Sequence, residues 1–321
     1  MKPKAIVYSK LPEEVLEYVK GHCDASCFDA PDSSPGSPFA EALKEAEGLL
    51  GAGLKVDAAL LDRASRLKVV SNISVGYDNL NIPEISRRGI MATNTPGVLN
   101  DTVADTIFGL LVATARRMPE LDRYVRNGQW KDSRDDVQFG LDVHHKKLGI
   151  IGLGGIGEKI VQRARFGFDM DIIYHNRSRN PKLEEQYGAA YRTLDELLAE
   201  ADFVCLMTPL TPETRGMIGE REFKLMKKTA IFVNGSRGAT VDEEALIEAL
   251  RSGTIWAAGL DVYVQEPLPE NHPLLSLDNA VLLPHIGSAT RETRLEMAWT
   301  AARNLVAGLI GKTPPNLIQA K

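Results

Sequence analysis

The sequence GLGGIG at residues 152–157 constrains the fold of this chain most strongly. The apolar run KKLGII at 146–151 precedes it, and EKIVQRARFG at 158–167 follows with its apolar residues at helical spacing. A glycine-rich turn between a buried strand and a helix is typical of units that bind a dinucleotide. A purely structural turn, or another nucleotide-type ligand, remains the alternative.

Each glycine of this motif has a separate physical role. Gly152 permits the tight turn, and Gly154 allows the backbone to approach a pyrophosphate. Gly157 lets the helix lie close to the sheet. The amides of Gly155 and Ile156 are then expected to face phosphate oxygens at the positive end of the helix.

Strand and helix patterns alternate along most of the chain, which predicts βαβ units and parallel sheets. An early series occupies the first hundred residues, and a second series starts at the glycine motif. The strands expected in the second series are 148–152, 170–175, 203–207, 230–234, 256–261 and 281–283. We therefore expect an α/β fold with two flavodoxin- or Rossmann-like lobes.

Some residues are candidates for capping the predicted helices. Asp101 or Thr102 is a candidate cap for a buried apolar helix. Thr240 and Glu243 have the spacing of a capping box. The final helix, 291–312, follows the last strand of the second series, and we expect it to return to the first lobe. The expected lobes are residues 1–100 with 289–321, and residues 101–288.

The composition excludes several classes of protein. The net charge of −5 argues against nucleic acid as a partner. Cys23 and Cys27 resemble half of a metal site, but no second Cys/His pair completes it, so no metal is expected. The chain has too few cysteines for a disulfide framework, no signal peptide is recognised at its start, and the apolar stretch 106–115 is too short to cross a bilayer. We expect a cytoplasmic protein that does not bind membranes.

The second strand of a dinucleotide unit usually ends at an acid that binds the adenosine ribose. This chain instead has Asn176, Arg177 and Ser178, followed by Arg179. Arg177 offers a fork of donors suited to a 2′-phosphate, with neutral donors from its two neighbours. The pattern favours NADP(H) over NAD(H), and the alternative is that both arginines are solvated surface charges.

Three chemically complementary residues follow three late strands. Arg237 comes after AIFVN, Glu266 after AAGLDVY, and His285 after VLLP. Ligands of open α/β sheets bind beyond the carboxyl ends of the strands. A histidine–carboxylate pair supplies a proton near neutral pH, and an arginine holds and polarises a keto acid. The other histidines are expected to be structural, although His175 lies where it could contact adenosine.

The chain resembles the D-isomer-specific 2-hydroxyacid dehydrogenases over nearly its whole length. The resemblance rests on SVGYDN, GLGGIG, NGSRG, AAGLDVYVQEPLP and LLPHIGSAT, in that order. It implies a substrate-binding lobe split around a dinucleotide-binding lobe. It also implies a homodimer, built partly by the arm RRMPELDRYVRNGQW.

The resemblance also implies roles for individual residues. Arg237 would anchor the substrate, His285 would be the acid/base and Glu266 its partner, while the backbone of Val75 and Gly76 would bind the substrate carboxylate. The remaining cofactor contacts that we expect are Thr106, Thr208, Ser236, Asp261 and Gly287.

The residues predict NADPH-dependent reduction of small 2-keto acids. The resemblance implies that the products are D-2-hydroxy acids and that glyoxylate, hydroxypyruvate and 2-ketogluconate are the substrates. Two alternatives remain: an NAD-dependent D-lactate or D-3-phosphoglycerate type dehydrogenase, and a non-catalytic protein that senses dinucleotides.

Overall fold

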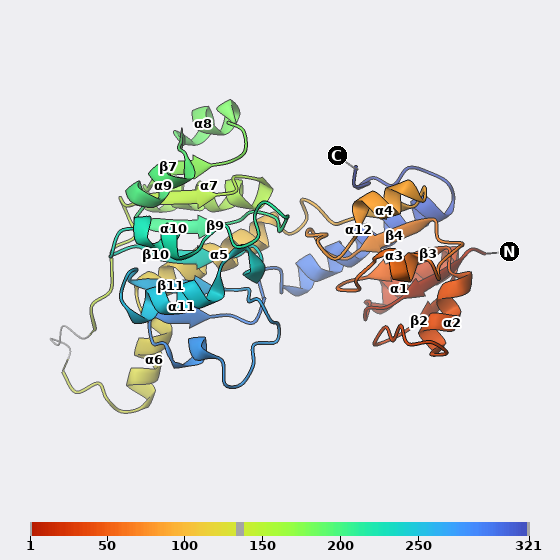
Figure 1. Ribbon diagram of the computed structural model, residues 1–321, viewed down its shortest axis with the longest axis horizontal. Coiled ribbons are helices and arrows are strands. Elements are labelled where there is room, and N and C mark those ends of the chain that lie inside the picture. Colours follow the sequence, from red (N-terminus) through yellow and green to blue (C-terminus); the bar gives the residue numbers. More distant parts are fainter. Residues whose placement is uncertain (1, 133–137, 320–321) are drawn as a thin grey trace. The chain divides into compact units, whose positions relative to one another are not determined.

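The computed structural model describes residues 2–132 and 138–319, and the chain divides into two compact units. The first unit comprises residues 1–99 and 289–321, and the second comprises residues 100–288. Each unit is an α/β body with a parallel sheet (Figure 1). The expected fold class is therefore confirmed.

The first unit is built from alternating strands and helices and receives the last helix of the chain. Its elements are β1 (Lys4–Val7), α1 (Glu13–His22), β2 (Asp24–Cys27), α2 (Pro38–Glu45), β3 (Gly48–Gly51), α3 (Ala58–Leu61), β4 (Val69–Asn72), α4 (Ile82–Arg87), β5 (Met91–Thr93) and α12 (Arg291–Leu309). The strand order is β2-β1-β3-β4-β5, which is the flavodoxin-like order.

Apolar side chains bury both faces of this first sheet. Phe39, Leu43 and Leu60 belong to one core cluster, and Val15 and Leu305 belong to another. Helix α12 packs on β3 and β4. The sequence after residue 288 is therefore needed to complete the core of a unit that begins at the other end of the chain.

The second unit holds the glycine motif. Its elements are α5 (Asn100–Ala115), α6 (Met118–Arg126), β6 (Lys147–Ile151), α7 (Gly155–Phe168), β7 (Asp171–His175), α8 (Pro181–Tyr187), β8 (Ala190–Tyr191), α9 (Leu194–Glu200), β9 (Phe203–Leu206), α10 (Glu220–Leu225), β10 (Ile231–Asn234), the 3₁₀ turn η2 (Gly238–Thr240), α11 (Glu243–Arg251), β11 (Ala257–Leu260), the 3₁₀ turn η3 (Pro273–Ser276) and β12 (Ala280–Leu282). The sheet order is β12-β11-β10-β9-β6-β7-β8. Counted within this unit, it is the doubly wound order 3-2-1-4-5-6 with one further edge strand.

The order of this sheet reverses between β6 and β9. These strands pair in parallel, with Ile151 opposite Leu206 at their carboxyl ends. Such a switch point leaves a crevice in which open α/β sheets bind their ligands. The loop that leaves β6 at this point is the glycine motif.

Three expectations about element ends need correction. Helix α5 begins at Asn100, so Asp101 and Thr102 lie in its first turn and are not caps. Thr240 does not cap α11 either, because it ends a 3₁₀ turn and donates to the carbonyl of Arg237; Asp242 is the cap and accepts from the Ala245 amide. The second sheet also contains β8, a two-residue strand beyond the six that were expected.

Helix α5 is buried, as its apolar sequence predicts. Val103, Ile107 and Leu111 are each less than a tenth exposed, and the helix packs against α7, β10 and β11. It therefore lies inside the second unit and supports the strands that carry the site.

Candidate active site

The glycine loop has the geometry that a pyrophosphate requires. Gly152 has φ of +101°, and a Cβ there would lie 2.7 Å from the carbonyl carbon of Met207, so a side chain is excluded by both strain and contact. At Gly154, by contrast, a Cβ would meet no atom within 4 Å, so the backbone is open to an approaching ligand. Gly154 also occupies the N-cap of α7 without a side-chain cap.

The first amides of α7 are available to that ligand. Those of Gly155 and Ile156 have no acceptor within the helix, because the first turn of any α-helix lacks one. They lie at the positive end of a helix of 14 residues, where an anion is stabilised. The loop and helix together therefore fit a dinucleotide diphosphate.

Asn176 holds this loop in place from the end of β7. Its Oδ1 accepts from the Leu153 amide at 2.7 Å, and its Nδ2 donates to the Leu153 carbonyl at 3.2 Å. His175 is also engaged, with Nδ1 3.0 Å from the carbonyl oxygen of Arg192. The side chain of Asn176 thus shapes the glycine loop, a role that the sequence did not suggest.

The two arginines after β7 have different surroundings. Arg179 donates twice to Glu184, from Nε at 3.0 Å and from Nη2 at 2.7 Å. Hydrogen bonds from Arg179 and then from Tyr174 lower the pKa of Glu184 to about 2. Arg177 and Ser178 are exposed. Arg177 makes no hydrogen bond or ion pair with another residue in 2–132 or 138–319, but its charge helps to lower the pKa of Glu213, after the hydrogen bond from Thr211.

The three residues predicted to act chemically follow neighbouring strands. Arg237, Glu266 and His285 follow β10, β11 and β12. These strands are adjacent and parallel, with Asn234 paired to Leu260 and Leu260 to Leu282. Their carboxyl ends therefore meet at one edge of the second sheet.

His285 and Glu266 form a direct pair. Nδ1 of His285 lies 2.7 Å from Oε2 of Glu266, and Oε1 of Glu266 accepts from the Tyr263 amide at 3.0 Å. Burial raises the pKa of Glu266, but the hydrogen bonds from His285 and Tyr263 and the positive charges outweigh it, so the pKa lies below its ordinary value. Because a carboxylate accepts at Nδ1, that nitrogen carries the hydrogen and Nε2 is left for a ligand.

Asp261 fixes the backbone next to His285. Its two carboxylate oxygens accept from the amides of Ile286 and Gly287, at 2.8 and 2.9 Å. Burial raises the pKa of Asp261, and the two amides oppose that rise. His285 has φ of +53°, which is costly for a residue with a side chain, and these two bonds help to hold that conformation.

The turn that carries Arg237 is held by buried polar groups. Asn234 Oδ1 accepts from both the amide and the hydroxyl of Ser236, at 3.0 and 2.8 Å. Thr240 Oγ1 lies 3.0 Å from the Ser236 hydroxyl. Ser236 is only 7% exposed, so the structure gives its hydroxyl a role within the turn.

Two predicted threonines lie in the second unit and are half-buried. Thr106 Oγ1 donates to the carbonyl of Gly287 at 3.3 Å, which brings two of the predicted cofactor residues together. Thr208 follows β9, and its Oγ1 lies 3.6 Å from the sulfur of Met217.

Val75 and Gly76 lie in the first unit, on the loop after β4. Their carbonyl oxygens accept from the side chains of Asn94 and Asn72, at 2.8 and 2.9 Å. Within residues 2–132 and 138–319, no acceptor is found for the two amides. Neither asparagine was predicted from the sequence: Asn94 reaches Val75 from the loop after the neighbouring strand β5, and Asn72 is the last residue of β4.

No group of three or more His, Cys, Asp or Glu side chains in 2–132 and 138–319 has the arrangement of a metal site. Over the same ranges, no helix combines the length and the apolar character that a membrane span needs.

Comparison with known proteins agrees with this geometry. The family described as D-isomer specific 2-hydroxyacid dehydrogenase, NAD binding domain, matches residues 108–287. The chain is 49% identical over 323 residues to glyoxylate/hydroxypyruvate reductase B of Cronobacter sakazakii, covering 100% of this chain and 99% of that protein. It is 47% identical over 318 residues to the protein of that name from Yersinia enterocolitica, covering 99% and 98%.

A solved structure is similar over the same length. The NADPH-dependent glyoxylate/hydroxypyruvate reductase of Sinorhizobium meliloti, in complex with NADP and malonate, has a TM-score of 0.89 and 32% identity. The match covers 99% of this chain and 97% of that one. The chain therefore belongs to the D-isomer-specific 2-hydroxyacid dehydrogenases, and it is an oxidoreductase with a nicotinamide dinucleotide-binding domain.

Proposed function

We propose that this protein reduces small 2-keto acids with NADPH. The observation that carries the proposal is the His285–Glu266 pair, at the same sheet edge as Arg237 and in the unit that holds the glycine loop. Glyoxylate, hydroxypyruvate and 2-ketogluconate are the proposed substrates. The names of the similar reductases support the first two.

Arg237, His285 and Glu266 have separate roles in this proposal. When bound, the cofactor supplies a hydride to C2 of the keto acid. Nε2 of His285 gives its proton to the carbonyl oxygen, while Glu266 holds the imidazole through Nδ1 and stabilises its protonated form. Arg237 binds the carboxylate and polarises the carbonyl.

The substrate carboxylate needs further donors, and we propose the amides of Val75 and Gly76. The Ser74 carbonyl accepts from the Thr95 amide at 3.0 Å, and the Val75 carbonyl accepts from Asn94 at 2.8 Å. These bonds fix the two peptide planes that carry the amides of Val75 and Gly76. Amides fixed in advance bind an anion at a smaller cost in conformational entropy than mobile groups.

NADPH is proposed over NADH because of Arg177. Arg179 is bonded to Glu184, whereas Arg177 is exposed and only attracts the Glu213 carboxylate without a hydrogen bond or ion pair in the described ranges, so its guanidinium can bind a phosphate. No carboxylate stands among residues 176–180 to accept from a ribose 2′-hydroxyl or to repel a 2′-phosphate. The Sinorhizobium meliloti reductase, which is described as NADPH-dependent, supports this choice.

A homodimer is proposed from the arm, residues 116–130, which contains α6. Helix α6 buries none of its residues. Large apolar side chains on the arm and at Phe139 are more than half exposed: Met118, Val125, Trp130 and Phe139. Exposed apolar residues gathered on one segment mark a surface that another protein covers, and a second copy of this chain is the proposed partner.

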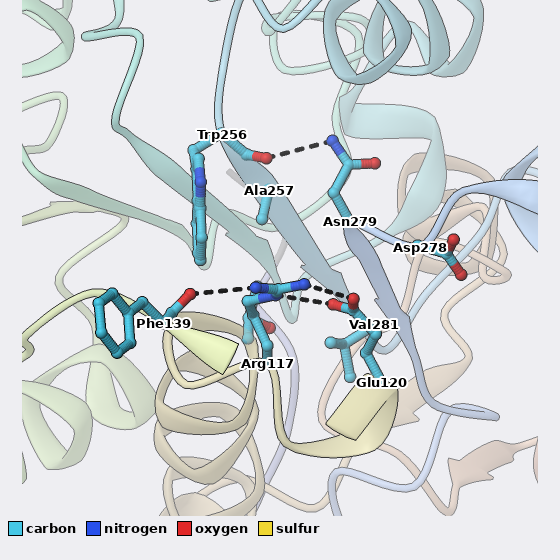
Figure 2. A pocket seen from close by; sticks show the side chains of 9 residues that line it. Arg117, Glu120, Phe139, Trp256, Ala257, Asp278, Asn279 and Val281 are labelled. Carbon is cyan, nitrogen blue, oxygen red and sulfur yellow. Dashed lines mark hydrogen bonds and ion pairs between the residues drawn. The ribbon is translucent and has the colours of Figure 1, made fainter. Parts of the chain in front are cut away.

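A pocket of about 280 Å³ lies where the arm meets the sheet, at the end of β11 and β12 opposite His285. Figure 2 shows the Arg117 guanidinium there, bonded to Glu120 and to the Phe139 carbonyl, across from Trp256 and Asn279. These bonds fix the direction in which the arm leaves the second unit. The pocket is proposed as part of the surface that the second copy covers.

The test is a comparison of NADPH and NADH oxidation with a panel of 2-keto acids of increasing length. The proposal predicts turnover with glyoxylate and hydroxypyruvate and a higher kcat/KM with NADPH. A preference for NADH together with turnover of pyruvate or a phosphorylated substrate would favour a D-lactate or D-3-phosphoglycerate type enzyme. Tight dinucleotide binding without turnover of any keto acid would favour a sensing protein.

A further inference from the structure

Glu266 lies on a long loop, residues 261–272, between β11 and the turn η3. The loop contains no helix or strand, so its position depends on individual contacts. Within the loop, Glu266 itself bonds to the Tyr263 amide. The His285–Glu266 pair supports proton transfer only if the loop holds the Glu266 carboxylate in position relative to the imidazole to within a fraction of an ångström.

One carboxylate outside the loop contacts both of its ends. Glu243 is the first residue of α11, and its Oε2 accepts from the Val264 amide at 3.2 Å. Its Oε1 lies 3.2 Å from Nε2 of His272. Nδ1 of His272 accepts from the Leu274 amide at 3.3 Å, so the hydrogen of the neutral ring is on Nε2 and points at Glu243.

The contact between Glu243 and His272 is partly shielded from solvent, whereas the bond to the Val264 amide is exposed. The side chains of Glu243 and His272 are 18% and 16% exposed, against 35% and 46% for Glu266 and His285. Hydrogen bonds to a charged group in such surroundings are stronger than those at an open surface. The position of Glu243 at the start of a helix further stabilises its negative charge.

The same end of the loop also packs against the turn that carries Arg237. A Cβ at Gly238 would lie 1.9 Å from the carbonyl carbon of Tyr263 and 2.3 Å from the Val264 nitrogen. The backbone of 237–238 is thus in direct contact with the backbone that Glu243 holds. A shift of Val264 would displace the Glu266 loop and remove support from the Arg237 turn.

We propose that Glu243 is a positioning residue for the active site: it joins the two ends of the 264–272 segment and so holds Glu266 against His285. This role rests on the proposed function, but Glu243 itself touches none of the reacting groups. His272 contributes to this role because it supplies the contact between Glu243 and the far end of the segment.

The test compares Glu243→Gln with Glu244→Gln, which removes an exposed carboxylate from the same helical turn. Glu243→Gln is expected to lower kcat by about 10- to 100-fold with the Kd for NADPH unchanged, and Glu244→Gln to leave both unchanged. His272→Gln, which can still donate to Glu243, should keep most of the activity, and His272→Ala should lose it.

A double-mutant cycle separates positioning from general stability. In the Glu266→Gln background, Glu243→Gln should reduce kcat little further, because the carboxylate that it positions is already gone. Fully additive losses, or a loss in Glu244→Gln equal to that in Glu243→Gln, would overturn the proposal.

A second readout does not depend on turnover. The Nδ1–H proton of His285 should give a low-field NMR signal in the wild type and in Glu244→Gln, and that signal should be lost in Glu243→Gln at a temperature where the variant is folded. A signal that persists in Glu243→Gln would refute the positioning role. If the wild type reduces no keto acid and yet the signal behaves as expected, the proposed function fails and the positioning of Glu266 by Glu243 stands.

Discussion

Nδ1 of His285 lies 2.7 Å from Oε2 of Glu266, and the two residues reach each other from loops that follow adjacent strands. Asp261 holds the backbone beyond the histidine, and Tyr263 holds the other oxygen of Glu266. The imidazole is thus fixed from two sides with its second nitrogen available.

Glu266→Gln keeps the shape of this pair and removes its charge. We expect kcat to fall by roughly tenfold or more, because the protonated imidazole loses its counter-ion while its orientation is largely kept. The measurement is kcat at saturating NADPH and glyoxylate. Unchanged kcat would show that the carboxylate has no part in the proton transfer.

The lowered pKa of Glu266 also predicts a pH dependence in the wild type. Activity that depends on the carboxylate is lost as the pH falls through its lowered pKa, and is present at higher pH. The midpoint of any loss of kcat/KM caused by this group should therefore lie below about pH 4.3, the ordinary value for glutamate. An acid limb above that pH which disappears in Glu266→Gln would contradict this assignment.

Arg177→Ala tests the choice of cofactor. It should lower kcat/KM with NADPH by about 10- to 100-fold, the value of one or two charge-assisted hydrogen bonds to phosphate, and change kcat/KM with NADH little. Arg179→Ala is the matched control, because Arg179 is bonded to Glu184. An equal loss with both cofactors would mean that Arg177 does not recognise the 2′-phosphate.

The lowered pKa of Glu184 predicts how the stability of the second unit depends on pH. Its pKa is lowered from 4.5 to about 2, so its contribution to stability is fully present above pH 4.5 and is lost as the pH falls toward 2. Glu184→Gln should make the melting temperature less dependent on pH in that range, while Glu185→Gln, next to it and exposed, should not. Circular dichroism melts at several pH values provide the measurement, and identical slopes in both variants would exclude this role.

Met118→Asp tests the dimer. The charge should weaken association across the arm and shift the mass in light scattering toward that of one chain, 35.2 kDa. Ile310→Asp changes an equally exposed apolar residue in the first unit and should leave the assembly intact. A wild-type chain that is monomeric at micromolar concentration would remove the basis of the proposal.

Much of this fold could be predicted because most of its strands are buried and apolar, and because glycine- and proline-containing turns separate the helices and strands. The glycine motif predicted the position of the first strand of the second sheet, and the alternation of strands and helices predicted that the strands pair in parallel. Two edge strands were harder to recognise: β2 reads DASC and is largely exposed, and β8 has only two residues. Such segments carry neither an apolar run nor a readable alternation.

The contacts that support the site could not be predicted from short stretches of sequence. His272 gave no signal in the sequence, because its partner Glu243 is 29 positions away and on a different element. Thr240 and Glu243 fitted a capping pattern, yet Asp242 caps the helix and Thr240 supports the Arg237 turn. Sequence spacing predicts contacts within one helix, strand or turn. Contacts between residues of different elements are seen only in the folded structure.

The proposed role of His285 is tested most directly by following NADPH oxidation and 2-hydroxy acid formation from glyoxylate, in the wild type and in His285→Gln, with NADPH binding measured in parallel. One hydroxy acid per NADPH is expected in the wild type. Turnover is expected to fall by about 100- to 10,000-fold in the variant, which still binds NADPH normally. Turnover in His285→Gln close to that of the wild type would contradict the assignment of His285 as the proton donor.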